Sequence, residues 1–166
     1  NIPIIGAQNR IIDDAGIDDD SFSYLPDDVC LKNIIAPSFF DVHKSLYDGE
    51  FTHYWFKGGR GSTKSSFISI EIILGIMTDP DANGVILRKV GVNLRDSVFE
   101  QLLWAIDILG VQDLWSEKQN PLELCFLPTG GRIKFKGADK PRKIKSIKFK
   151  NGYCKYIWYE EADEFK

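Results

Sequence analysis

Eight residues at positions 58–65, with the sequence GGRGSTKS, have the composition of a loop that binds phosphate groups. The usual pattern is a glycine, four residues, a second glycine, a lysine and a serine or threonine, placed between a strand and a helix. Glycines let successive backbone N–H groups turn toward a phosphate, and the helix N-terminus adds partial positive charge. We expect Lys64 to reach the β- and γ-phosphates of ATP and the Ser65 hydroxyl to bind Mg²⁺.

Thr63 stands where the second glycine of the pattern is expected. If Thr63 adopts a positive φ, that conformation is unfavourable for a β-branched residue. The alternative to a phosphate-binding loop is a chance glycine-rich turn. The flanking strand and helix favour the loop, and the residues expected to contact ATP are then Gly58, Gly59, Arg60, Gly61, Ser62, Thr63, Lys64 and Ser65.

Two glutamates, Glu160 and Glu161, follow the apolar run YIWY at residues 156–159. Ligands of open α/β sheets bind at the carboxyl ends of the strands, so a strand here would hold both carboxylates at such a site. We assign Glu160 to Mg²⁺, through water, and Glu161 to orienting and activating the attacking water. Taken alone, the pair could be a solvated strand end; its position roughly 95 residues after the loop favours a Walker B segment.

The segments around these motifs predict strands that alternate with helices. An aromatic run at 51–56 is suited to a buried strand, and apolar residues at helical spacing follow the loop. Later segments predict a hairpin around the turn at 128–131. We therefore expect a three-layer α/β fold with a mainly parallel sheet and a β-hairpin insertion. The expected strands are 51–56, 85–89, 122–127, 132–136 and 156–159, and the expected helices are 37–46 (with Ser38 as N-cap), 64–77 and 93–109.

The composition narrows the classes of protein. The chain has 166 residues, 43% of them hydrophobic, and a net charge of -3, which describes one ordinary globular domain. No apolar run approaches the roughly 20 residues of a membrane span. Three scattered cysteines and two histidines argue against a disulfide framework, a histidine-based metal site and a catalytic triad.

Charge is distributed unevenly along the chain. Residues 1–50 contain ten acidic and three basic residues, whereas residues 132–155 contain ten basic residues and one aspartate. We interpret residues 1–34 as an acidic N-terminal arm and residues 35–166 as the domain. The basic second half indicates either a polyanionic partner or a solvated basic face.

Over roughly residues 35–166 the chain resembles the large terminase subunits of phages. The shared features, in the same order, are GGRGSTKS, the strand at 85–89 followed by Asp96-Ser97-Val98, KIKSI at 143–147, and WYEEADEF at 158–165. The likeness looks closest to the branch found in phages and prophages of Gram-positive bacteria. The resemblance implies an additional-strand P-loop ATPase that uses ATP and Mg²⁺ to drive double-stranded DNA into a capsid.

The same resemblance implies partners and further site residues. The working form would be a homo-oligomeric ring on the portal protein, loaded by a small terminase subunit, in the cytoplasm of the infected or lysogenic bacterium. Arg60 becomes a candidate arginine finger or nucleotide sensor, unless it only ties the loop to a neighbouring carboxylate. Arg88 and Lys89 could contact nucleotide or DNA, or form a structural ion pair. Candidates for an adenine pocket, each equally a candidate for the core, are Phe39, Phe40, His43 and Tyr54.

In that family a coupling motif and a nuclease domain follow the Walker B segment. We therefore expect residues 35–166 to be a partial ATPase domain, from Walker A to Walker B, without either of these parts. The strand that lies between the 51–56 and 156–159 strands would be absent, and this region alone would not turn over ATP. Two alternatives stay open: another additional-strand ATPase, such as a helicase or recombination motor, and a non-catalytic nucleotide-binding module.

Overall fold

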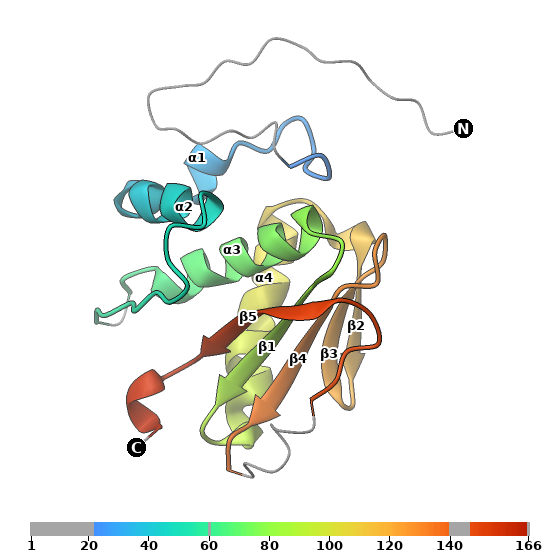
Figure 1. Ribbon diagram of the computed structural model, residues 1–166. Coiled ribbons are helices and arrows are strands. Elements are labelled where there is room, and N and C mark those ends of the chain that lie inside the picture. The colour runs from blue at the N-terminus through green and yellow to red at the C-terminus, as the bar shows by residue number, and fades with distance from the viewer. Residues whose placement is uncertain (1–21, 60, 140–146, 166) are drawn as a thin grey trace.

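The computed structural model describes residues 22–59, 61–139 and 147–165 of the chain. Within these residues one mixed sheet has the strand order β2-β3-β4-β1-β5 (Figure 1). The middle strand of the parallel part, β1, pairs in parallel with β4 and β5, whereas β2–β3 and β3–β4 are antiparallel. The strands are β1 (Ala82–Arg88), β2 (Trp115–Gln119), β3 (Leu122–Phe126), β4 (Arg132–Gly137) and β5 (Tyr153–Tyr159).

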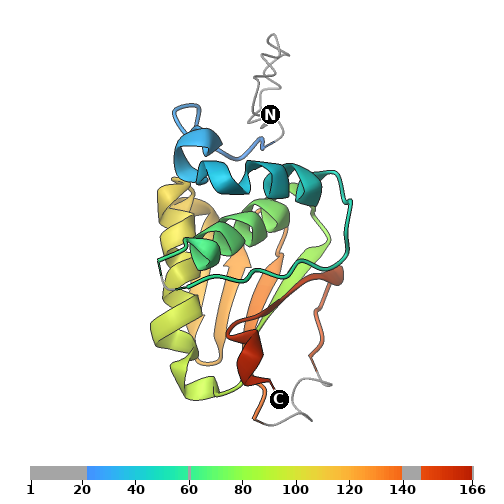
Figure 2. The same cartoon turned by 90° about the vertical axis from the view of Figure 1, so that its left-hand side faces the viewer.

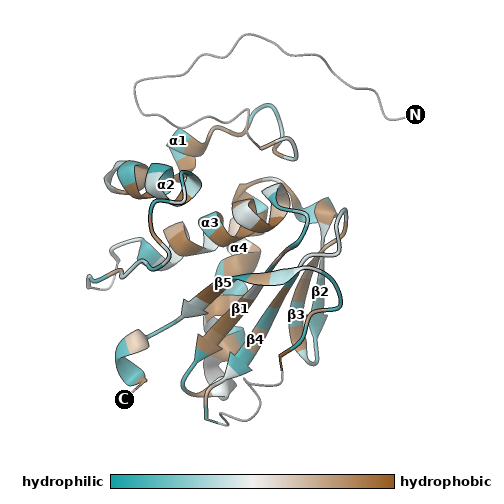
Figure 3. Cartoon of the chain, in the orientation of Figure 1, coloured by the Kyte–Doolittle hydropathy of each residue, from teal (hydrophilic) through white to brown (hydrophobic). Residues whose placement is uncertain are grey.

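Two helices, α3 (Lys64–Thr78) and α4 (Glu100–Ile108), cover the same face of this sheet (Figure 2). On that face Gly84 of β1 lies beside Ile72 of α3, and the ring of Phe99, just before α4, makes an edge contact with Phe135 of β4. Apolar residues lie along α3, α4 and β1 (Figure 3). Eight of the fifteen residues of α3 are buried. The core therefore lies between α3, α4 and one side of the sheet.

The N-terminal part of the described chain packs on α3 rather than on the opposite face of the sheet. It contains α1 (Leu31–Ile34), a 3-10 turn at Pro37–Phe39 and α2 (Phe40–Tyr47). Phe39 stacks on Phe67 of α3 with ring centroids 4.5 Å apart, and His43 Nδ1 lies 2.6 Å from a Glu71 carboxylate oxygen. Phe22 and Leu31 are buried, so residues 22–34 of the expected arm contribute to the core. Residues 1–21 lie outside the described residues.

A close approach between α3 and β5 fixes the last strand to the domain. A Cβ atom added at Gly75 would overlap the Tyr156 hydroxyl, so glycine lets the ring lie directly against the helix. The Tyr153 hydroxyl and the Lys155 ammonium both donate to Asp79, which follows the end of α3, at 2.7 and 2.9 Å. These contacts hold β5 in place from one side, while its ladder with β1 holds it from the other.

Most of the expected elements are confirmed, but the expected strand at 51–56 is wrong. The structure gives these residues no helix or strand, and the Phe51 and Trp55 side chains are 58% and 85% exposed. The physical reason is the lack of a hydrogen-bonding neighbour, since a strand needs a partner for its backbone groups. On the side of β5 away from β1, no strand of the described residues is paired.

Three finer expectations also need correction. The sheet is mixed rather than mainly parallel, and among the described residues helices cover only one of its faces, so a three-layer arrangement is not formed there. Ser38 makes no cap hydrogen bond, because the 3-10 turn begins with Pro37. The helix expected at 93–109 is divided into a 3-10 turn at Gly91–Leu94, a π-helical turn at Arg95–Phe99 and α4.

The hairpin of β3 and β4 forms as expected, but the sequence analysis missed β2. Four of its five side chains are exposed, so the strand has no apolar pattern. None of the helices in the described ranges has the length and hydropathy that crossing a membrane requires.

We expect Gly75→Ala to destabilise the domain by about 1–3 kcal/mol, because the added methyl group forces the Tyr156 ring away from α3. Thermal unfolding followed by circular dichroism measures the change. Gly84→Ala is the matched control: its Cβ atom would meet Ile133 at 3.6 Å, an ordinary contact. Equal unfolding midpoints for the two variants would contradict the close approach.

Candidate functional site

The glycine-rich loop and the acid pair lie at the same edge of the sheet because α3 and β1 have similar lengths and run in opposite directions. The 15 residues of α3 span about 22 Å at a rise of 1.5 Å each. The seven residues of β1 span about 23 Å at 3.3 Å each, and only three residues connect the two elements. The start of α3, at Lys64, therefore lies over the carboxyl end of β1. Ligands of open α/β sheets bind at this edge.

The loop before α3 contains two residues with a positive φ. Gly61 has a φ of 76°, and Thr63, at the N-cap position of α3, has a φ of 57°. Thr63 therefore adopts a left-handed conformation that usually favours glycine. A site that tolerates such local strain is a candidate for function.

The Lys64 ammonium lies inside the curve of its own loop. Its Nζ atom donates to the carbonyl oxygens of Gly58 and Gly59 at 2.8 and 3.2 Å, and to the Ser62 hydroxyl at 2.5 Å. A Cβ atom at Gly58 would lie 3.4 Å from this Nζ, so the glycine leaves room around the cation. The loop thus forms a small concave site around one positive charge, next to a helix N-terminus.

The acid pair lies at the carboxyl end of β5. The ladder with β1 pairs Leu87 with Tyr159, and the Glu160 N–H donates to the Leu87 carbonyl at 2.9 Å. Glu160 is half-buried. Glu161 is exposed and has a φ of 53°, so the chain turns sharply out of the strand there and continues as a 3-10 turn at Ala162–Glu164.

The charges around Glu160 connect the two motifs. Burial raises the pKa of the Glu160 carboxyl above its ordinary value of 4.5, and repulsion from Glu161 raises it further. The positive charges of Arg88 and Lys64 oppose this shift of the pKa. The structure therefore brings Lys64 and Glu160 within electrostatic reach of each other, at one edge of the sheet.

The residues at this edge fit a nucleotide with its magnesium ion. Mg²⁺ prefers oxygen ligands and is usually held by one or two carboxylates together with phosphates and water. Hydroxyl and carboxylate oxygens, from Ser65 in the first turn of α3 and from the acid pair, supply that donor set. In the ranges that the structure describes, no group of three or more His, Cys, Asp or Glu forms a metal cage.

A cavity of about 290 Å³ lies beside the start of α3. Thr63, Ser66 and Phe67 line it from the loop and helix, and Trp104 of α4 closes another side. Among the four candidates for an adenine pocket only Phe39 lines this cavity; Phe40 packs against the core. His43 is buried against Glu71, and the Tyr54 hydroxyl bonds to Ser45 at 3.0 Å.

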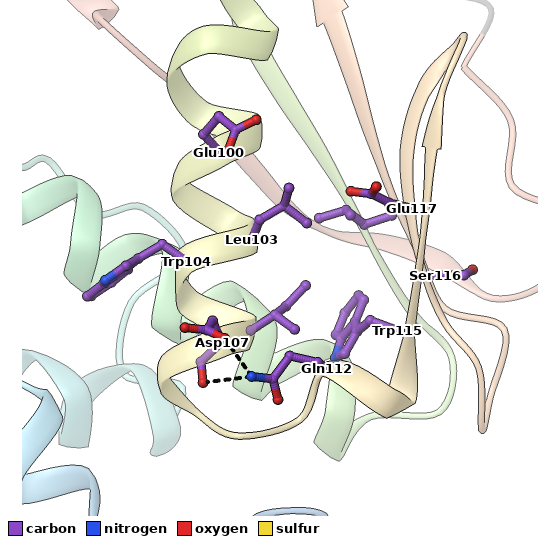
Figure 4. Close-up of a pocket in the computed structure, with 10 residues that line it drawn as sticks. Glu100, Leu103, Trp104, Asp107, Gln112, Trp115, Ser116 and Glu117 are labelled. Atoms are coloured by element: carbon purple, nitrogen blue, oxygen red, sulfur yellow. Dashed lines mark hydrogen bonds between the residues drawn. The ribbon is translucent and has the colours of Figure 1, made fainter.

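A second cavity, of about 480 Å³, lies elsewhere, between α4 and β2 (Figure 4). Its lining includes the apolar side chains of Leu103 and Trp115 and the carboxylates of Glu100 and Glu117. Asp107 of α4 also lines this cavity, and its carboxylate accepts a hydrogen bond of 2.6 Å from the Gln112 side chain. No residue of the loop or of the acid pair lines it, so this cavity is separate from the candidate site.

The other candidate residues are distributed as follows. Arg60 and residues 140–146 lie outside the described residues. Lys134, in the basic second half, donates to the Lys148 carbonyl at 2.6 Å and lies 4.9 Å from the centroid of the Phe149 ring. Arg88 was a candidate for contact with nucleotide or DNA, or for a structural ion pair; its guanidinium donates to the Ser97 hydroxyl at 2.9 Å.

Comparisons with known proteins agree with the family resemblance. Residues 51–166 match the family model described as phage terminase large subunit. The chain is 41% identical over 138 residues to the terminase large subunit of Bacillus phage SPP1, covering 83% of this chain and 32% of that protein. It is 33% identical over 132 residues to the PBSX phage terminase large subunit of Bacillus subtilis (strain 168), covering 80% and 28%. The chain thus spans about a third of the length of these curated relatives.

The raised pKa of Glu160 predicts how its substitution changes stability with pH. As the pH rises above 4.5, the unfolded chain loses this proton before the folded chain does, so the free energy of unfolding falls. We expect Glu160→Gln to raise the thermal midpoint of the ligand-free protein at pH 7.5, and the gain to disappear near pH 4. Glu164→Gln, in the exposed 3-10 turn nearby, is the control. A gain that does not depend on pH would contradict the assigned cause.

Proposed function

This chain belongs to the phage terminase large subunit family, and from that premise we propose that it contains the ATPase site of a DNA-packaging motor. ATP hydrolysis at this site drives double-stranded DNA into the phage capsid. The observation that carries the proposal is the convergence of Lys64 and Glu160 at one edge of the sheet, although 95 residues separate them in the sequence. A phosphate-binding cation and an acid pair are the two parts that such ATPases share.

In this proposal the loop binds the phosphates of ATP. Backbone N–H groups of residues 58–65 and the N-terminus of α3 contact the phosphate oxygens. The Lys64 ammonium exchanges its bonds to the Gly58 and Gly59 carbonyls for bonds to the β- and γ-phosphates. Arg60, by its place in the loop, is proposed to stabilise the negative charge that moves during transfer of the phosphoryl group.

The acid pair has two proposed roles. Ser65 and Glu160 hold Mg²⁺, which neutralises phosphate charge when bound. The nearby cation also favours the ionised form of Glu160, which burial and Glu161 otherwise disfavour. Glu161, exposed beyond the end of β5, orients the attacking water and accepts its proton. The chain leaves the strand at the left-handed Glu161, which is exposed, whereas Glu160 is half-buried, and the proposal gives the two carboxylates different tasks.

The cavity beside α3 is the proposed site of the nucleotide base. It adjoins Thr63 and Ser66, next to the residues proposed to bind phosphate, and its walls include the aromatic side chains of Phe39 and Trp104. Its volume of about 290 Å³ is near the lower limit for ligand pockets. Aromatic walls suit a planar base, which can stack or make edge contacts there.

The proposed partners follow from the family. They are double-stranded DNA, the portal protein, the small terminase subunit and further copies of the chain in a ring, in the cytoplasm of the infected or lysogenic bacterium. The described basic residues of the second half include Lys134, Lys136, Lys148 and Lys150. Such lysines would attract the DNA backbone in a salt-dependent way that does not depend on sequence.

ATP hydrolysis by the full-length protein tests the proposed site. We expect Glu161→Gln to lower kcat by about 10²- to 10⁴-fold while nucleotide binding is retained, because it removes only the base. Lys64→Ala should lower kcat/KM by at least about 100-fold and weaken nucleotide binding as well. Phosphate release and titration with a fluorescent ATP analogue measure the two effects.

Asp163→Asn is the matched control, since this carboxylate lies two residues beyond Glu161 in the exposed 3-10 turn. It should hydrolyse ATP at the parent rate. Equal rates in the parent protein, Lys64→Ala and Glu161→Gln would refute the ATPase assignment. Binding of nucleotide without any turnover by the parent protein would instead favour a non-catalytic nucleotide-binding module.

A further inference from the structure

Arg88 occupies the position next to Glu160 on the neighbouring strand. The ladder between β1 and β5 pairs Ile86 with Trp158 and Leu87 with Tyr159. The Glu160 N–H still donates to the Leu87 carbonyl, so the same register continued by one residue places Arg88 opposite Glu160. Side chains two residues apart on a strand point to the same face. Arg88 and Glu160 therefore share the face on which Ile86 and Trp158 pack. The Arg88 charge acts on the Glu160 carboxyl from this position.

The backbone of Arg88 is fixed on both sides. It pairs with Gly137 of β4, and its carbonyl accepts a hydrogen bond of 2.8 Å from the Ala138 N–H. On the other side the Leu87 carbonyl accepts the Glu160 N–H at 2.9 Å. A guanidinium that starts from such a rigid strand end has little freedom except in its own side-chain torsions.

Ser97 restricts that remaining freedom. Arg88 donates to the Ser97 hydroxyl at 2.9 Å, and both side chains are half-buried. Ser97 lies in the π-helical turn at Arg95–Phe99, a rare form that is frequent at functional sites. The turn reaches this place because the backbone of Gly91 lies against Gly137, where a Cβ atom would leave no space.

We propose that Arg88 is a positioning residue of the ATPase site, held by Ser97 so that its guanidinium orients the Glu160 carboxylate. This inference rests on the proposed function, because Glu160 has a role only if the site hydrolyses ATP. It assigns a task to the π-helical turn, which is to support a cation beside the acid pair. A lysine could supply the charge but not a planar guanidinium, one end of which donates to Ser97 while the rest remains beside the acid pair.

The first test measures the contact without any nucleotide. Thermal unfolding is measured for Arg88→Met, Glu160→Gln and the double variant, together with the parent protein. We expect Arg88→Met to lower the thermal unfolding midpoint by more when Glu160 is present than when glutamine replaces it. A matched control cycle uses Arg95, whose guanidinium donates to the Gln119 carbonyl, in place of Arg88. The substitution Arg95→Ala should show no coupling to Glu160→Gln.

The second test measures ATP hydrolysis by the full-length protein. Arg88→Lys and Ser97→Ala should each lower kcat by about tenfold, the size of effect expected for loss of one hydrogen bond to a charged group, with KM for ATP nearly unchanged. Ser97→Thr keeps the hydroxyl and should restore most of the rate. Arg95→Ala should keep the parent rate. If Arg88 and Ser97 had a purely structural role, these substitutions would lower stability and weaken ATP binding together. The values of kcat and KM would then both change.

The outcomes distinguish this inference from the proposed function. Coupling of Arg88 to Glu160, with the kcat effects above, supports the positioning role. An active parent protein without that coupling, or with unchanged kcat in Arg88→Lys and Ser97→Ala, overturns the positioning role and leaves the ATPase site intact. A parent protein that neither binds nor hydrolyses ATP refutes the proposed function, and the positioning role is then refuted with it.

Discussion

The candidate site depends on one geometric match, between the length of α3 and the length of β1. Because the helix returns over the strand after a turn of three residues, its first residue, Lys64, lies at the carboxyl end of the sheet. β5 ends at the same edge, since it runs parallel to β1. The packing of α3 supports this alignment, with Gly75 against Tyr156 at one end and Phe67 against Phe39 at the other.

Electrostatics adds a second constraint at that edge. Burial raises the pKa of the Glu160 carboxyl, and repulsion from the adjacent Glu161 carboxylate raises it further. Arg88 and Lys64 offset part of this repulsion but leave the acid pair short of positive charge. Perturbed carboxylates of this kind are typical of functional sites, where a bound cation completes the balance of charge. The unbalanced charge lowers the stability of the protein when no cation is bound. The contacts of β5 with α3 and Asp79 support the strand that carries the acid pair.

The strand at 51–56 and the strand β2 show where prediction from sequence stopped. The aromatic run at 51–56 has a strong preference for strands, yet preference alone does not supply a hydrogen-bonding neighbour. In β2 the opposite holds, since polar residues with no apolar pattern pair with β3 as part of a hairpin. The helix expected at 93–109 is interrupted at the π-helical turn of Ser97, and no spacing of apolar residues indicates such a turn. The strand predictions at 51–56 and β2 thus depended on whether a distant partner was present, which local sequence does not state.

The sequence by itself determined the local chemistry: a glycine-rich loop around Lys64, a long apolar helix after it, and two glutamates at the end of a strand. These features depend on neighbours within a few residues, whose types limit the backbone directly. Only the tertiary structure decided that Lys64 lies within electrostatic reach of Glu160, that the sheet register places Arg88 beside Glu160, and that His43 pairs with Glu71. Such contacts join residues 28 to about 95 positions apart, and they follow from the register of the sheet and the packing of its helices, which local sequence does not specify.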